Sequence, residues 1–478
     1  MSKRNFILLI IIIILAIISV FGYFYFNPTT NTSEDGGIGT NFISQFNPFG
    51  RGTTKPPTNT NPTVNVSGYQ PSTTEIKNIK LKKVSSVPIA GFTVFSKERL
   101  KEIPIPEPSP IPTPTQTNLP LSGEGVAPTS EQGLSLPETT NMGSVAKIGL
   151  KKPTKPTPPQ TEFMPALRYV DRTTGNIYQT FADKIEERRF STTIIPMIYE
   201  AFFGNKGNSV IMRYLKSDLK TIITFVGTLP KESLGADTTT DNEIKGVFLP
   251  ENIRDMSLSS DANSVFYLFN SGDSAIGATL SLLTNKKVQV FDSPFTEWLS
   301  SFPNSKMITF TTKPSSGTPG YMYAMNPSNK NYNFNKILNG INGLTTLISP
   351  NGKLVLYSDN NLSLNIYHTD TKVSDVLGVK TLAEKCTWNK TGDTVYCGVP
   401  KSIANAQYPD SWYQGGVSFS DQIWKIDIKT GNTTIIADLS TISGGENIDS
   451  IKLALDNEEN YLFFVNKKDS FLWELGLK

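Results

Sequence analysis

Short apolar segments separated by turn residues fill the chain from residue 162 to residue 478. They are rich in valine, isoleucine and aromatic residues, and turn signals recur about every 8 to 12 residues. No long stretch keeps the apolar period of a helix. The pattern therefore predicts an all-β region.

A unit of four strands repeats along this region. It is clearest at residues 347–379, where an apolar strand, an Asn-Gly turn, a second apolar strand, a polar loop, a strand ending in aromatics and a last strand follow one another. The same order recurs at 256–291, 386–436 and 451–477, with looser copies at 197–215 and 298–338. Four-strand units at a spacing of roughly 40 residues or more are typical of β-propeller blades.

The number of strands predicts how the propeller closes. The last unit supplies only three strands before the chain ends at residue 478. Residues 77–84 have the length and alternation of an outer strand, and residues 87–95 can follow as the innermost strand of blade one. This arrangement gives seven blades, closed by the two ends of the domain, and it removes exposed sheet edges. Residues 97–163 then become an insertion inside blade one.

Several turns resemble the consensus of the TolB-like and WD40-like propeller repeats. The segments SPNGKLVLYS with NIYHTDTK, and DQIWKIDIKTGNTT, match that consensus, and VDRTTGNIYQTF matches it in part. The resemblance implies a propeller over about residues 162–478. It implies no particular activity, because propellers carry many unrelated functions.

An apolar segment at residues 6–26 follows Lys3 and Arg4 and ends in aromatic residues. Its length suffices to span a bilayer, and it exceeds the apolar region of about 7 to 15 residues in a cleaved signal peptide. Positive residues before it place residues 1–5 in the cytoplasm. We therefore expect a single-pass cell-membrane protein with an extracytoplasmic propeller.

Proline content separates the remaining segments, because 20 of the 32 prolines lie before residue 160. Such segments bury too little apolar surface to offset the entropy lost on ordering. The predicted layout is a flexible Pro/Thr-rich stalk at 27–74 and a propeller at 75–478. Within the propeller, residues 75–96 hold the closing strand and the first strand of blade one, 97–163 form a disordered insertion, and 164–478 form the remaining blades.

The two cysteines flank a turn-rich segment, NKTGD, in blade six. If the turn centres between Thr391 and Gly392, Cys386 lies opposite Cys397. Opposed strand residues have Cβ atoms about 4.5 to 5.5 Å apart, near the reach of a disulfide. We expect a disulfide outside the cytoplasm; the alternative is two buried thiols. A metal site with His368 is disfavoured, because zinc usually takes four ligands.

The sequence contains few features that are typical of catalysis or of nucleic-acid binding. The chain has one histidine, no G-x-S-x-G elbow, no phosphate-binding loop and no dinucleotide fingerprint. A net charge of +3 is too small for a nucleic-acid-binding field. We expect no catalytic residues, no cofactor, no metal and no nucleic-acid partner.

A long connection in blade six, within residues 400–421, is the main candidate for partner binding. It carries the candidate residues Tyr408, Asp410, Trp412, Tyr413 and Phe419. Amphipathic aromatics suit recognition surfaces; the alternative is a plug that folds over the propeller end. As a second-to-third-strand connection, the loop should lie on the face opposite the stalk and the insertion.

The expected function is a non-catalytic, membrane-anchored scaffold that binds a protein or an envelope polymer. The alternatives are an exported hydrolase with a site at the propeller channel and a subunit of a secretion or pilus-like envelope machine.

Overall fold

The structure is a computed structural model that describes residues 71–72, 79–101, 160–232, 242–329, 334–442 and 444–478. The predicted anchor at 6–26, most of the stalk and the central part of the insertion lie outside these residues. Among the residues that are described, no helix is both long and apolar enough to cross a bilayer.

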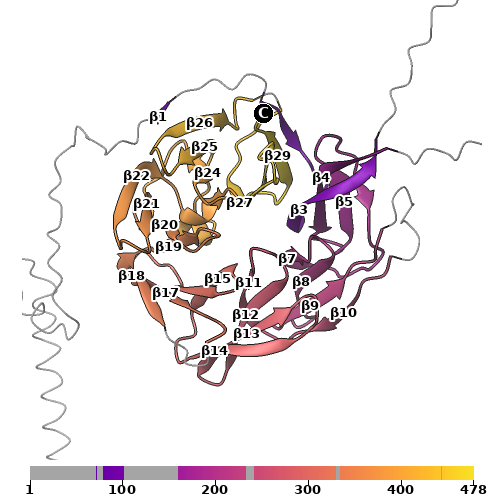
Figure 1. The fold of residues 1–478 in the computed structure, drawn as a ribbon, viewed down its shortest axis with the longest axis horizontal. Helices are drawn as coiled ribbons and strands as arrows, with labels where there is room; N and C mark the ends of the chain where they lie inside the picture. Colours follow the sequence, from indigo (N-terminus) through magenta and orange to yellow (C-terminus); the bar gives the residue numbers. More distant parts are fainter. Residues whose placement is uncertain (1–70, 73–78, 102–159, 233–241, 330–333, 443) are drawn as a thin grey trace, which may run out of the picture. The chain divides into compact units, whose positions relative to one another are not determined.

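The described chain forms seven mainly antiparallel sheets arranged in a ring, which confirms the predicted seven-bladed propeller (Figure 1). Blades one to three consist of β3 (Ile89–Leu100), β4 (Thr161–Asp171), β5 (Ile177–Phe181) and β6 (Arg188–Arg189); β7 (Ile198–Gly204), β8 (Ser209–Leu215), β9 (Ile222–Thr228) and β10 (Lys245–Phe248); and β11 (Ile253–Leu258), β12 (Ser264–Ser271), β13 (Ser274–Ser281) and β14 (Lys287–Ser293).

Blades four and five consist of β15 (Trp298–Asn304), β16 (Met307–Thr312), β17 (Pro319–Met325) and β18 (Asn335–Asn342), and of β19 (Thr345–Ile348), β20 (Leu354–Ser358), β21 (Ser363–His368) and β22 (Ser374–Lys380). A short 3-10 helix, η2 (Ala383–Lys385), leads into blade six, which contains β23 (Cys386–Trp388), β24 (Thr394–Pro400), the one-turn helix α2 (Asp410–Tyr413), β25 (Asp421–Asp427) and β26 (Thr433–Asp438). Blade seven contains β27 (Ser450–Leu455), β28 (Tyr461–Asn466) and β29 (Leu472–Gly476).

Blade seven takes its fourth strand from the N-terminal side of the domain. The strand β2 (Leu81–Lys83) pairs antiparallel with β29, with Lys82 opposite Glu474. The next strand, β3, is the innermost strand of blade one. The two ends of the domain therefore meet in one sheet, as the strand count of the sequence requires.

The edges of the predicted insertion are wrong. Residues 97–100 and 161–163 are not disordered but belong to β3 and β4, which pair as far as Leu100 and Thr161. Charged hydrogen bonds stabilise these paired ends of β3 and β4. The Arg99 guanidinium donates to Glu162 and, through both terminal nitrogens, to Asp183 at 2.9 and 2.6 Å. Residues 102–159 lie outside the described chain.

The last residues of the predicted stalk also form structure. Residues Pro71–Ser72 form β1, which pairs parallel with β26 and adds a fifth strand to blade six. The outer strand β26 would otherwise present unpaired backbone groups on this side, and such edges readily accept another strand. The predicted stalk, which ends at residue 74, therefore wrongly includes β1.

Aromatic side chains fill the space between blades three and four. Phe266 and Phe291 of blade three contact Phe310 and Trp298 of blade four, and the stacked rings of Phe291 and Phe310 are 4.2 Å apart. Burial of each such side chain contributes about 1.5 to 3 kcal/mol. This packing joins blades that share no strand pairing.

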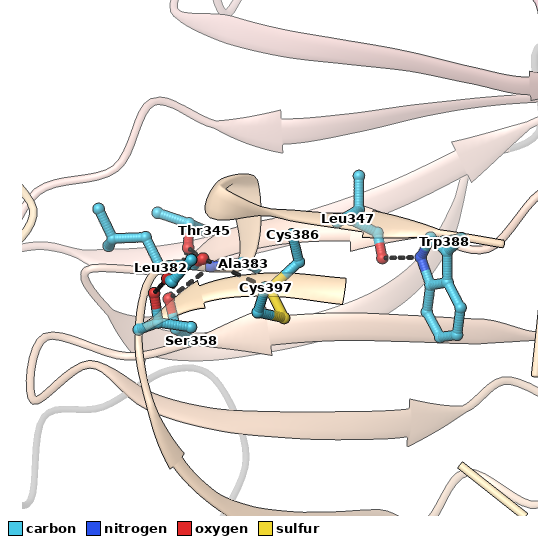
Figure 2. Close-up of a disulfide and its surroundings, with 10 residues drawn as sticks. Thr345, Leu347, Ser358, Leu382, Ala383, Cys386, Trp388 and Cys397 are labelled. Atoms are coloured by element: carbon cyan, nitrogen blue, oxygen red, sulfur yellow. Dashed lines mark hydrogen bonds between the residues drawn. A yellow bond between two sulfur atoms is a disulfide. The ribbon is translucent and has the colours of Figure 1, made fainter. Parts of the chain in front are cut away.

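The predicted disulfide is confirmed. Cys386 and Cys397 are direct register partners in β23 and β24, and their sulfur atoms are bonded (Figure 2). Gly392 in the intervening turn has a φ of 73°, a conformation that glycine adopts without steric cost. Nearby, the Trp388 indole donates to the Leu347 carbonyl oxygen in blade five at 3.3 Å, as Figure 2 also shows.

Candidate functional site

The blade-six connection between β24 and β25 folds back on the propeller. Tyr408, Trp412 and Phe419 are buried and pack with Leu362 and Leu382 in one apolar cluster. The ring of Phe419 stacks on both Tyr408 and Trp412, with centroids 5.8 and 6.3 Å apart. For these three side chains the structure corresponds to the plug alternative, and a partner-binding role for them stays a prediction.

A fully buried charge cluster lies beneath this connection. The Lys385 ammonium donates to Asp421 Oδ2 at 2.8 Å and to Asp449, and all three side chains have 0% exposure. Asp449 also accepts hydrogen bonds from the Trp412 indole at 2.9 Å and from the Phe419 backbone amide at 3.0 Å. Because burial of an unpaired charge is costly, these bonds fix the connection onto blades six and seven.

The remaining two candidate residues contact segments outside the blade-six connection. Asp410 accepts a 2.6 Å hydrogen bond from the backbone amide of Ser316, in the β16–β17 connection of blade four. Tyr413 is 39% exposed, and its hydroxyl donates a hydrogen bond to Glu384 in η2. Desolvation by the surrounding protein raises the pKa of Glu384 to about 6, although part of this residue remains exposed to solvent. The connection therefore extends from blade six to blade four.

A small cavity lies beside Tyr413 and the innermost strands of blades four and five. Its volume is about 60 Å³, and Ser300, Thr345 and Glu384 contribute to its lining. Such a volume admits one or a few water molecules. It is too small for a sugar or a peptide.

A much larger groove, which the sequence did not predict, lies between blades one and two. Its volume is about 1220 Å³, and it lies where the first-to-second and third-to-fourth connections turn, on the face opposite the blade-six connection. Seven cationic and four acidic side chains line it: Lys97, Arg99, Arg168, Lys184, Arg188, Lys206 and Lys231, and Glu98, Glu186, Glu187 and Glu232. The groove therefore carries a surplus of positive charge.

Arg168 forms the floor of this groove. Its guanidinium is 3% exposed and lies between the rings of Phe95 and Phe190, at 4.9 and 4.2 Å from their centroids. It donates to Gln179 Oε1 at 2.8 Å and to the Gly207 carbonyl oxygen at 2.6 Å. A guanidinium held on all sides in this way is a rigid, pre-oriented donor for a carboxylate.

One carboxylate already occupies this donor set. Glu232, which follows β9 of blade two, accepts hydrogen bonds from Lys97, Arg168, Gln179 and Arg188. These donors lie in β3, β4, β5 and β6, one in each strand of blade one. Burial alone would raise the pKa of Glu232, but the hydrogen bond and charge of Lys97, together with the two arginines, hold that pKa below its usual value.

No local sequence motif predicts the four donors that bind Glu232. Arg168 is opposite Gln179, and Gln179 is opposite Arg188, only because of the strand register of blade one. Lys97 lies at the edge of a Pro-rich segment that the sequence assigned to disorder. The one signal of this site in the sequence is that charged residues cluster at the ends of the predicted strands.

His368 lies beside a single carboxylate. It ends β21, and its Nε2 is 3.2 Å from Asp375 Oδ2 in β22. In the part of the chain that the structure describes, no group of three or more His, Cys, Asp or Glu side chains is arranged to hold a metal ion.

Comparisons with known proteins give similarity of fold only. No family model and no curated protein sequence matches the chain. Solved structures that are similar include an oligogalacturonate lyase in complex with manganese, with 10% identity, a TM-score of 0.41 and coverage of 66% of this chain and 85% of that one. An oligogalacturonate lyase from Vibrio parahaemolyticus has 9% identity, a TM-score of 0.42 and coverage of 66% and 94%. TolB from Acinetobacter baumannii has 12% identity, a TM-score of 0.35 and coverage of 66% and 76%.

Proposed function

We propose that this protein is a membrane-anchored, extracytoplasmic β-propeller that acts as a non-catalytic scaffold and binds another protein or an envelope component. The observation that carries this proposal is the groove between blades one and two. Its volume of about 1220 Å³ exceeds the usual size of a small-molecule pocket, about 300 to 1000 Å³. Its charged lining favours a large, polar partner.

The disulfide supports the proposed location of the propeller. Cys386 and Cys397 are the two cysteines of the chain, and they are bonded to each other. Structural disulfides persist mainly in exported proteins, because cytosolic thiols are kept reduced.

The blade-six connection is the other surface proposed for a partner. Its exposed side, around Tyr413, lies on the face of the propeller opposite the groove. Tyr408, Trp412 and Phe419 are less suited to direct contact, because they pack inside the propeller. We therefore place the main partner at the groove.

A hydrolase with a site at the propeller channel is the second candidate function. Two carboxyl groups favour it: desolvation by the surrounding protein raises the pKa of both Asp255 and Glu384 to about 6, and Asp255 accepts hydrogen bonds from Ser300. Perturbed carboxyl groups are frequent at catalytic sites. The adjoining cavity of about 60 Å³ leaves no room for a polymeric substrate, so we favour the scaffold. A role as a subunit of an envelope machine is a special case of the scaffold.

Crosslinking in native membranes tests the proposal. The full chain, expressed at its natural level, should crosslink to one predominant envelope protein or polymer, which mass spectrometry identifies. Protease added to intact spheroplasts should degrade the propeller. Full protection of residues 75–478, or hydrolytic activity of the purified chain that is lost in the Glu384→Gln variant, would contradict the scaffold.

A further inference from the structure

The groove between blades one and two already binds a carboxylate that a polypeptide presents. Lys231 and Glu232 leave blade two and place one carboxylate against four donors of blade one. The contact joins two blades that share no strand pairing. The donor set therefore recognises a glutamate side chain that arrives from outside its own sheet.

This carboxylate uses only part of the groove. The four donors lie at the floor, whereas Lys206 and Lys231 line the rim and form no ion pair with any residue that the structure describes. The volume of about 1220 Å³ accommodates several amino-acid residues beyond one carboxylate. A ligand with several negative charges could contact both the floor and the rim.

The aromatic rings of the groove favour a peptide over an acidic sugar. Sugars usually pack on open aromatic faces, but here the guanidinium of Arg168 covers Phe95 and that of Arg99 lies over Phe181, 5.1 Å from the ring centroid. The surfaces left for a ligand include the cationic donors of the floor and the rim, beside the carboxylates of Glu98, Glu186 and Glu187. Such donors suit the flexible carboxylates of an acidic peptide.

We propose that this groove is the docking site for a glutamate-rich segment of a partner protein, and that Glu232 occupies the place of one ligand carboxylate until the partner displaces it. The proposal rests on the scaffold function proposed above and adds the chemistry of the partner. Glu232 is then an internal competitor, so its removal strengthens partner binding. Charges of the rim steer the acidic segment into the groove.

Fluorescence anisotropy with a labelled hexaglutamate peptide tests this proposal on the full chain in detergent. The Glu232→Gln variant keeps the shape of the side chain and removes its charge. We expect it to bind the peptide at least about tenfold more tightly than the wild type, with an affinity that falls as salt rises. Adding Arg188→Gln to this variant should abolish the gain.

Two further variants serve as controls. Glu251→Gln removes a carboxylate that pairs with Lys216 at 3.5 Å outside the groove, and it should bind the peptide like the wild type. Lys206→Glu reverses a charge on the rim and leaves the floor intact, so it should weaken binding at least about threefold. This last variant tests the proposal even if Glu232→Gln fails to fold.

Thermal unfolding provides an independent readout. The Glu232→Gln variant should have a lower Tm than the wild type, because three cations lose their counter-charge, and the peptide should restore that Tm by binding the folded state. Equal affinity of wild type and folded Glu232→Gln would overturn the proposal, as would unchanged binding by Lys206→Glu. Tighter binding of trigalacturonate than of hexaglutamate would overturn the choice of a peptide.

The two proposals can fail separately. If hexaglutamate binds no variant but crosslinking in membranes still yields a partner, the scaffold stands and the acidic ligand is wrong. If the peptide binds as expected but no partner is crosslinked, the groove is a binding site and the scaffold function is contradicted.

Discussion

Lys82 and Glu474 face each other across the strand pair that closes the propeller. Their Cα atoms are register partners in β2 and β29, and Lys82 Nζ is 3.7 Å from Glu474 Oε1. The Glu474 side chain is 2% exposed, and its Oε2 has no hydrogen-bond partner among the described residues. The junction between the two ends of the domain therefore contains an incompletely compensated buried carboxyl group.

This carboxyl group predicts a pH-dependent stability. Burial raises the pKa of Glu474 to about 7, and Lys82 offsets only part of that effect. In the unfolded chain the pKa is about 4.3, so the folded state binds more protons between these values. The contribution of Glu474 to stability is therefore present below about pH 4.3 and is lost as the pH rises to about 7.

The Glu474→Gln variant should lose this dependence. Relative to the wild type, its free energy of unfolding should increase between pH 5 and pH 8, by on the order of 2 kcal/mol. Urea unfolding at the two pH values measures the difference. The exposed Glu251→Gln variant should show no such change; parallel pH dependence in wild type and Glu474→Gln would exclude Glu474 as the cause.

Removal of the closing strand should release the ring. Deletion of residues 79–84 takes away β2 and leaves the edge of β29 unpaired, so we expect aggregation of the purified chain. Deletion of six residues from the predicted stalk, 30–35, should leave the protein monodisperse. Size-exclusion chromatography with light scattering compares the two; similar profiles would mean that β2 does not stabilise the closure.

The disulfide should contribute modestly to stability. A loop of this size gives at most about 3 kcal/mol in the chain-entropy model, and the sequence separation of 11 residues is already bridged by a hairpin. We expect the Cys386→Ala/Cys397→Ala variant to lose about 1 to 2 kcal/mol in urea unfolding. Thiol labelling of the unfolded, non-reduced wild type should detect no free cysteine.

Trp412 should stabilise the propeller rather than only contact a partner. Its ring packs in a buried cluster and its indole donates to Asp449, so Trp412→Ala should cost about 3 to 5 kcal/mol. Trp412→Phe keeps most of the packing and should cost about 1 to 3 kcal/mol through the unsatisfied Asp449. Tyr413→Phe is the matched control at the exposed neighbour. Unchanged stability of Trp412→Ala would show that the connection is loosely attached.

The sequence predicts the blades well because local features of the chain determine its strands and turns. Period-two alternation, turn residues such as Gly392 and the count of strands gave the seven blades, the closing strand and the Cys386–Cys397 pair. The contacts of Glu232 could not be predicted, because the donors come from four strands of blade one and the carboxylate comes from blade two. The burial of Trp412 likewise depends on Lys385 and Asp449, which are 64 residues apart in sequence.

Site-specific photocrosslinking tests the central claim, a scaffold that binds its partner at the groove, most directly. A photoreactive amino acid is introduced at Lys206 in the groove, at Tyr413 in the blade-six connection, and at Lys216 as a control, and native membranes are irradiated. The proposed function predicts a strong adduct with one envelope protein from position 206 and none from position 216. An adduct from position 413 alone would contradict the claim, and so would the absence of adducts from every position in a correctly folded protein.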